Sequence, residues 1–135
     1  MKIWLELDGI ACTGAVSAPG AARALAALLP WSATAVHDIW SGHVLYVSEA
    51  CRLPLDDPAA EPRSNLFAGE LAYHPEDRRL LIGYDFGQFR TGPGRVSQVR
   101  LLGRLDREHA GYARWLERAR GLQADGQRPL VMRPA

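Results

Sequence analysis

Short alternating segments joined by tight turns constrain the fold of this chain more than any other feature. In Lys2–Leu7, apolar and polar side chains alternate, which is typical of a strand with one buried face. Asp8-Gly9 follows, and this dipeptide favours a two-residue hairpin turn because glycine tolerates positive φ. Ile10–Val16 is again strand-like, so the first part of the chain predicts a β-hairpin.

The rest of the chain continues the same pattern. Further strands are predicted at 34–40, 43–48, 71–74, 80–85, 96–103 and 129–132, with a second tight turn at Ser41-Gly42. A first helix is expected to be capped by Ser17 and ended by Pro30, and a second to be capped by Asp106 and to extend to Leu122. Eight strands are the number at which a closed barrel is filled by its own side chains, and closure removes exposed edges. We therefore expect a mainly β protein: a closed eight-stranded barrel capped by two α-helices.

Size and charge indicate one domain over residues 1–135 and exclude several classes of partner. A chain of 135 residues with 47% hydrophobic residues can bury a core without disulfides or metals. The net charge of +1 gives no electrostatic argument for binding nucleic acid or an anionic membrane. Glu6 and Asp8 interrupt any signal-peptide core, and the apolar stretch at 21–29 is well short of the roughly 20 residues of a membrane span. We expect a cytoplasmic protein, bacterial in style, with no nucleic-acid or membrane partner.

Two segments are predicted to be loops, at 51–65 and at 86–94. The first is rich in proline and carries Asp56-Asp57, which we expect to be solvated, and the second is rich in glycine. Long loops in compact domains are often functional. The two cysteines do not form a disulfide framework: Cys12 is expected to be buried, whereas Cys51 lies beside the first loop and is expected to be more exposed.

Aromatic and basic side chains gather on the middle strands and on the second loop. Aromatic walls with a few polar groups are typical of sites for small molecules or peptides. The guanidinium of Arg90 suits a carboxylate, so we expect it to anchor an anionic ligand. The candidate ligand-binding residues are His37, Trp40, His43, Tyr46, Tyr73, Tyr84, Phe86, Phe89 and Arg90. The alternative interpretation is that these residues only fill the core and the barrel ends.

Motifs for catalysis, metals and cofactors are missing from the sequence. There is no G-x-S-x-G element, and Gly92-Pro93-Gly94 cannot cradle phosphate because proline lacks an N–H and no Walker lysine follows. His37 and His43 could face each other near Asp38, but no compact ligand spacing supports a metal site. We therefore predict no catalytic residue, no metal and no cofactor.

The order of elements resembles the cyclophilin fold, and three stretches carry this resemblance. They are DIWSGHVLYV at 38–47, AGELAYHPEDRRLLIGY at 68–84 and VRLLGRLD at 99–106. Together they look like the small bacterial and archaeal cyclophilin-like domains of unknown function, and the resemblance covers nearly the whole chain. It implies an eight-stranded barrel capped by two helices.

The resemblance does not imply prolyl isomerase activity. Cyclophilins use an arginine on the third strand, where this chain has Asp38; His43 and Tyr46 stand at the following aromatic and glutamine positions, and Val99 stands at a histidine position. A carboxylate reverses the charge and removes every donor. We expect a non-isomerase domain that binds a small molecule or a peptide between the two loops. The alternatives are a weak prolyl isomerase, another small-molecule enzyme using His37, Asp38 and His43, or an interaction subunit of a larger complex. A homodimer is also a possible state.

Overall fold

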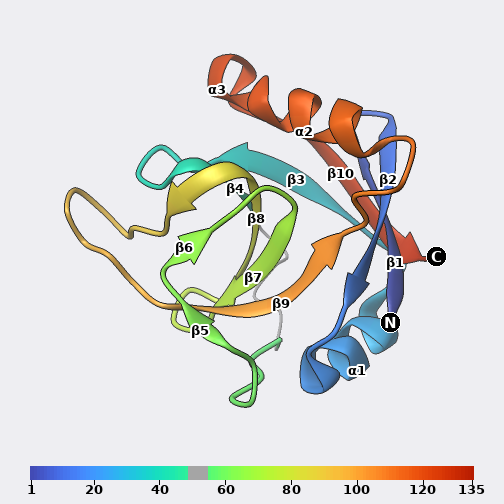
Figure 1. Cartoon of the computed structure of the whole chain (residues 1–135), viewed down its shortest axis with the longest axis horizontal. Coiled ribbons are helices and arrows are strands. Elements are labelled where there is room, and N and C mark those ends of the chain that lie inside the picture. Colours follow the sequence, from blue (N-terminus) through green and yellow to red (C-terminus); the bar gives the residue numbers. More distant parts are fainter. Residues whose placement is uncertain (49–54) are drawn as a thin grey trace.

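A closed antiparallel barrel forms the body of the protein (Figure 1). The structure, a computed structural model, describes residues 1–48 and 55–135. The strands follow the order β2-β1-β10-β3-β4-β8-β7-β9, and β9 pairs back with β2 to close the circle. The barrel strands are β1 (Lys2–Leu7), β2 (Ile10–Val16), β3 (Trp31–His37), β4 (Gly42–Ser48), β7 (Glu70–His74), β8 (Arg79–Gln88), β9 (Val99–Leu105) and β10 (Gln127–Pro134). The predicted eight-stranded barrel is confirmed.

The predicted hairpin at Asp8-Gly9 is present, whereas β3 and β4 pair around a turn at 38–41 rather than a two-residue turn at Ser41-Gly42. β1 pairs with β2 from Lys2↔Ala15 to Leu7↔Ile10, and the turn between them has φ of 49° at Asp8 and 83° at Gly9. Positive φ at both central residues suits the twist of a tight hairpin. β10 lies between β1 and β3 and pairs with both.

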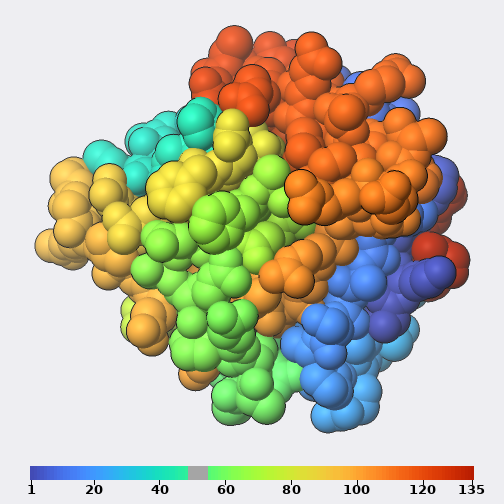
Figure 2. Space-filling model, viewed as in Figure 1, coloured from blue at the N-terminus to red at the C-terminus, as the bar shows by residue number. Residues whose placement is uncertain are grey.

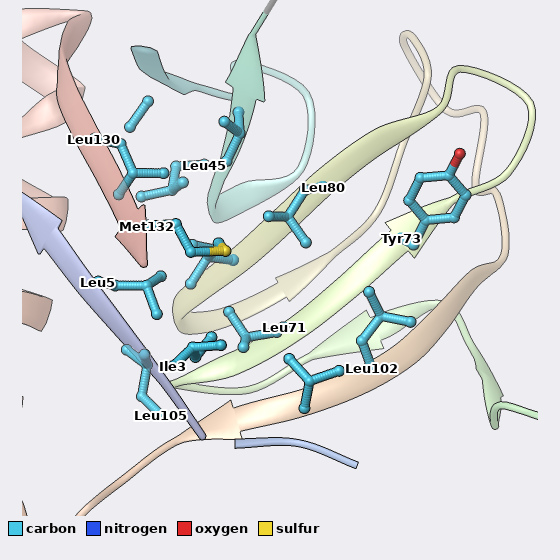
Figure 3. Packing of buried hydrophobic residues seen from close by; sticks show 14 of the residues in the cluster. Ile3, Leu5, Leu45, Leu71, Tyr73, Leu80, Leu102, Leu105, Leu130 and Met132 are labelled. Carbon is cyan, nitrogen blue, oxygen red and sulfur yellow. The ribbon is translucent and has the colours of Figure 1, made fainter. Parts of the chain in front are cut away.

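Alternating side chains of the strands fill the barrel interior (Figure 3). Removing apolar area from water stabilises the fold by about 25 cal/mol per Å², so these side chains supply most of the driving force for folding. The labelled members of this interior cluster are Ile3, Leu5, Leu45, Leu71, Tyr73, Leu80, Leu102, Leu105, Leu130 and Met132. Cys12 belongs to the same cluster and is fully buried, as expected; Cys51 lies outside the described residues.

In the part of the chain that the structure describes, three helices cover the barrel: α1 (Pro19–Leu28), α2 (Tyr112–Arg120) and the short α3 (Leu122–Asp125). α2 packs on β1, β2 and β8 and buries Trp115 completely. Neither predicted cap is present. Ser17 donates its hydroxyl to the carbonyl of Leu102, and Asp106 accepts the backbone N–H of Glu108 in a turn that precedes α2. None of the helices among the described residues is long and apolar enough to cross a membrane.

The cap of α1 comes from the first predicted loop. Asp57 Oδ2 accepts the N–H of Gly20 at 2.7 Å, and its Oδ1 accepts the N–H of Ala59 at 3.1 Å. A carboxylate at a helix N-terminus satisfies a free N–H group and opposes the helix dipole. Asp57 is therefore buried, contrary to the prediction that it is solvated, whereas Asp56 is exposed as expected.

The loop boundaries also differ from the prediction. The described part of the first loop contains two-residue strands, β5 (Pro62–Arg63) on β9 and β6 (Asn65–Leu66) on β8. β8 extends through Gln88 into the second predicted loop. β3 ends at His37 and β9 begins at Val99, so Trp40 lies in a turn rather than in a strand.

A second apolar cluster lies on the outside of the barrel, and it positions the candidate site. It forms because the segment after β8 and the short β6 fold back over the outer faces of β4, β7 and β8. This segment projects from the barrel beside the β3–β4 turn (Figures 1 and 2). The buried members of this outer cluster are Val44, Leu66, Ala72, Leu81, Phe89 and Val99, with Tyr46 packed against them.

Candidate functional site

Seven of the nine sequence-predicted residues gather in two places, one at an end of the barrel and one on its outer surface, and His37 borders both. His37, His43 and Tyr84 meet at one end of the barrel, beneath α3. Trp40, Tyr46, Phe89 and Arg90 line a groove on the outer surface, and His37 also borders this groove. Tyr73 and Phe86 belong to neither place. Tyr73 is a buried residue of the interior cluster, and Phe86 is exposed and packs on Phe67 with 5.5 Å between ring centroids.

A chain of hydrogen bonds organises the barrel end. Gln123 on α3 donates its Nε2 to the hydroxyl of Tyr84 at 3.0 Å, and this hydroxyl lies 3.3 Å from Nδ1 of His37. The amide N–H donates to this hydroxyl, which can donate its own proton to Nδ1 of His37 when the imidazole carries its proton on Nε2. His43 packs edge-on against Tyr84, and its Nδ1 lies 3.1 Å from the carbonyl of Phe86.

Burial shifts the pKa values of His37 and Tyr84 in the directions that favour their neutral forms. Desolvation lowers the pKa of His37, with a smaller opposing effect from the nearby carboxylate of Asp38. Desolvation also raises the pKa of Tyr84, while the hydrogen bond from Gln123 acts in the opposite direction. Both groups are neutral at pH 7, so this arrangement is a hydrogen-bonded support for α3.

The residues of a possible catalytic group are close together but do not act as a unit. His37 and His43 both contact Tyr84 but not through a shared hydrogen bond, and Asp38 accepts the backbone N–H of Trp40 and the hydroxyl of Ser41, both at 3.0 Å. No hydrogen bond joins the side chains of His37, Asp38 and His43, all of which are described. Among residues 1–48 and 55–135, no group of three or more His, Cys, Asp or Glu side chains could hold a metal ion.

The outer groove has a volume of about 350 Å³. One wall is the end of β3 with the β3–β4 turn, the floor is the outer face of β4 and β8, and the other wall is the segment after β8. This placement is only partly as predicted, because the first loop contributes no lining residue among those described. The lining residues are Val36, His37, Asp38, Ile39, Trp40, Tyr46, Asp77, Arg79, Phe89, Arg90 and Thr91.

Hydrogen bonds between the two walls hold Arg90 in the groove. The hydroxyl of Ser41 accepts the N–H of Arg90 at 2.9 Å and donates to Oδ2 of Asp38 at 3.0 Å. Ser41 and Asp38 are both buried, so this contact between the turn and the Arg90 segment excludes water. The backbone of Arg90 is fixed before any ligand binds.

The acidic and basic side chains of the groove differ in how far they are already paired. Both oxygens of Asp38 are occupied by its own turn, and Asp77 Oδ2 lies 3.2 Å from Nδ1 of His74. Arg79 stacks on the ring of Tyr46, with 4.4 Å from its guanidinium carbon to the ring centroid. Arg90 donates Nη2 to the amide oxygen of Gln88 at 3.0 Å. Within the described ranges, neither arginine forms an ion pair, so both guanidinium groups are available to an anion, although the hydrogen bonds of Asp38 leave its negative charge in place.

One nitrogen of Arg90 is buried without a hydrogen-bond partner among the described residues. This atom is Nε, the inner donor of the guanidinium fork. An unsatisfied buried donor destabilises a structure by roughly 1–3 kcal/mol, and a rotation of the guanidinium toward the groove would let a ligand oxygen relieve this penalty. The lining residues that the sequence did not indicate are Val36, Ile39, Asp77, Arg79 and Thr91, since their positions depend on how the turns fold back over β8.

No protein-family model and no curated protein matches this chain. Among solved structures, it is similar to McbB in complex with tryptophan, with a TM-score of 0.73 and 20% sequence identity over 98% of this chain. The chain spans 44% of the length of McbB. It is also similar to the hypothetical protein AF2241 from Archaeoglobus fulgidus, with a TM-score of 0.63 and 18% identity, covering 100% of this chain and 95% of that one. These likenesses show the barrel fold.

Proposed function

We propose that this domain binds a small carboxylate with a planar ring in the outer groove, with Arg90 as the anchor. The observation that carries the proposal is the buried, unpartnered Nε of Arg90 beside an aromatic wall. A carboxylate can accept two parallel hydrogen bonds from one guanidinium, which gives both charge and orientation. Arg79, which also lacks an ion pair among the described residues, adds to the positive potential that attracts an anion.

The shape of the groove supports a ligand of this size. Its volume of about 350 Å³ lies near the lower end of the range for small-molecule sites, so a ligand of one or two fused rings would fill it. Trp40, which is 43% exposed, and the buried Phe89 both line the groove and supply its aromatic surface. McbB, which shares the barrel, was solved with tryptophan, a molecule that combines a fused ring and a carboxylate.

The cyclophilin-like assignment is compatible with this proposal as a scaffold without isomerase chemistry. Asp38, which stands at the position of the isomerase arginine in the sequence resemblance, uses its carboxylate to hold the β3–β4 turn. It therefore offers no donor to a prolyl carbonyl. A prolyl isomerase assay should show no activity above the uncatalysed rate, and activity that disappears in His43→Ala would favour the enzymatic alternative.

Calorimetric titration with matched ligands tests the proposal. Indole-3-propionate and tryptophan provide a ring and a carboxylate, whereas indole-3-propionamide keeps the shape without the charge. We expect the carboxylates to bind and Arg90→Met to weaken them by about ten- to a hundredfold, since a hydrogen bond to a charged group contributes roughly 1.5–3 kcal/mol. Arg95→Met, in the same segment but outside the groove lining, should leave the affinity unchanged.

Two results would contradict the proposal. One is equal binding of the propionate and the propionamide, which would show that charge is not recognised. The other is a carboxylate affinity in Arg90→Met within twofold of that of the unaltered protein, which would show that Arg90 is not the anchor.

A further inference from the structure

An aspartate, a histidine and a serine form a line outside the barrel, in the arrangement that activates serine in hydrolases. His74 is the last residue of β7, Asp77 lies in the β7–β8 turn, and Ser97 lies just before β9. Nε2 of His74 is 3.0 Å from the hydroxyl oxygen of Ser97, and its Nδ1 is 3.2 Å from Oδ2 of Asp77. The two ring nitrogens therefore face a hydroxyl and a carboxylate on opposite sides.

Packing holds the imidazole in this orientation. His74 is only 1% exposed, and the ring of Phe89 lies against it with 4.7 Å between centroids. Ser97 is partly exposed, so its hydroxyl lies between the buried base and the surface. The position of Ser97 is fixed by its backbone N–H, which donates to the carbonyl of Phe89 at 3.1 Å. A buried, oriented base next to a more accessible hydroxyl is what nucleophilic activation requires.

The contact between His74 and Asp77 is short, but the Nδ1–H direction does not point well at the carboxylate, and Nδ1 has no other partner among the described residues. Catalytic hydrogen bonds are often poorly aligned in unliganded proteins and improve when substrate binds. The side chain of Asp77 is 45% exposed at the turn, so a small rotation is open to it.

We propose that Ser97 is an activated nucleophile, with His74 as its general base and Asp77 as the group that orients His74. In the reactive tautomer His74 carries its proton on Nδ1. Ser97 Oγ attacks the carbonyl carbon of an ester while its proton passes to Nε2 of His74. The bond between that carbon and the leaving oxygen then breaks, the leaving group takes the proton from Nε2, and an acyl-serine remains. Water then attacks the acyl carbon while its proton passes to Nε2 of His74, the bond from that carbon to Ser97 Oγ breaks, and Oγ takes the proton, so that the carboxylic acid is released and the serine is restored.

The surroundings of Ser97 limit the acyl group to a short one. A depression of about 180 Å³ is lined by residues that follow His74 and Ser97 in the sequence, Pro75, Glu76, Gln98, Val99 and Arg100, although Ser97 itself is not a lining residue. This space suits an acyl chain of a few carbons. Arg100 supplies a positive charge at this depression. Because this depression and the outer groove have no lining residue in common, the two proposals can fail separately.

Covalent labelling with a fluorophosphonate probe, followed by intact mass and peptide mapping, tests this proposal. We expect one adduct on Ser97 in the folded protein and none after unfolding in urea, because a free serine does not react. His74→Asn should slow labelling at least about a hundredfold, since general base catalysis contributes 10²–10⁴-fold. Asp77→Asn should slow it less, and Ser32→Ala, which removes an exposed serine of β3, should have no effect.

Stopped-flow absorbance measurements of p-nitrophenyl acetate hydrolysis give an independent readout. A burst of p-nitrophenol close to one per chain, with acetate mapped to Ser97, supports the proposal. The proposal is overturned if the unaltered folded protein takes no adduct, if adducts map only to Lys2 or other exposed groups, or if His74→Asn is labelled at the normal rate. The first two outcomes are decided on the unaltered protein, so a variant that fails to fold cannot obscure them.

Discussion

Replacing Glu70 by glutamine should reveal how strongly one buried carboxylate holds β5 and the segment before β7 on the barrel. Its Oε1 accepts Nη2 of Arg63 at 2.7 Å and the backbone N–H of Phe67 at 2.8 Å, while its Oε2 accepts Nη2 of Arg104 at 3.3 Å. The side chain of Glu70 is 5% exposed and that of Arg63 is 18% exposed, so their pairing takes place largely out of water.

The size of the effect follows from what the substitution leaves behind. Glu70→Gln keeps the volume and one acceptor but leaves the largely buried guanidinium of Arg63 without a charge partner at Glu70. Breaking a buried pair on one side destabilises a protein by about 3–5 kcal/mol. We expect a value near the lower limit, about 3 kcal/mol, because the side chain of Arg104 is 64% exposed and can be solvated.

Urea unfolding followed by tryptophan fluorescence measures this change in the free energy of unfolding. The matched control is Glu61→Gln, which removes the other carboxylate near Arg63; this contact is 3.6 Å long and the side chain of Glu61 is 60% exposed. The control should change stability by no more than about 1 kcal/mol. Equal effects of the two substitutions, or a loss below about 1 kcal/mol for Glu70→Gln, would refute the reasoning.

Three further predictions concern the helix cap, a buried histidine and a buried thiol. Asp57→Ala removes the cap of α1 and should reduce the free energy of unfolding by about 1 kcal/mol in urea titrations, whereas Asp56→Ala should not. Because burial lowers the pKa of His37 below its ordinary value of 6.5, the unfolded chain takes up this proton first as the pH falls. The free energy of unfolding should therefore decrease below about pH 6.5, and decrease less in His37→Gln. Burial raises the pKa of the Cys12 thiol to about 11, so in Cys51→Ser the remaining thiol should react with a disulfide reagent at pH 8 only after unfolding.

The barrel could be predicted because its information is local. Alternation in β1 and β2 and the Asp8-Gly9 turn specify a hairpin, and the register observed from Lys2 to Leu7 is the one that places Ile3, Leu5 and Leu7 inside. The buried role of Cys12 followed from the same alternation. The number of strands then made closure the expected way to remove edges.

The helix cap and the outer cluster could not be predicted because they depend on contacts between distant segments. The N-terminus of α1 is capped by Asp57, which lies far along the chain, so the local serine was a misleading signal. The end of β3 was placed too late because Trp40 has the character of a strand residue, whereas Asp38 captures its N–H and forms a turn.

The sequence indicated which types of residue line the groove, but it did not show that some of the nine candidates lie elsewhere. Trp40, Tyr46, Phe89 and Arg90 share the groove, as expected of a binding site. Tyr73 and Tyr84 are core residues, which alternation along their strands would also have allowed. The cytoplasmic location and the possible homodimer remain predictions.

The nitrogen that carries the central claim can be observed directly. In protein labelled with ¹⁵N-arginine, the Nε–H signal of Arg90 should shift during titration with indole-3-propionate, and its exchange with water should become slower. The same signal should remain in place with indole-3-propionamide. If the propionate binds while the Arg90 Nε–H signal stays unchanged and other arginine signals move, the outer groove is not the site and the proposed anchor is wrong.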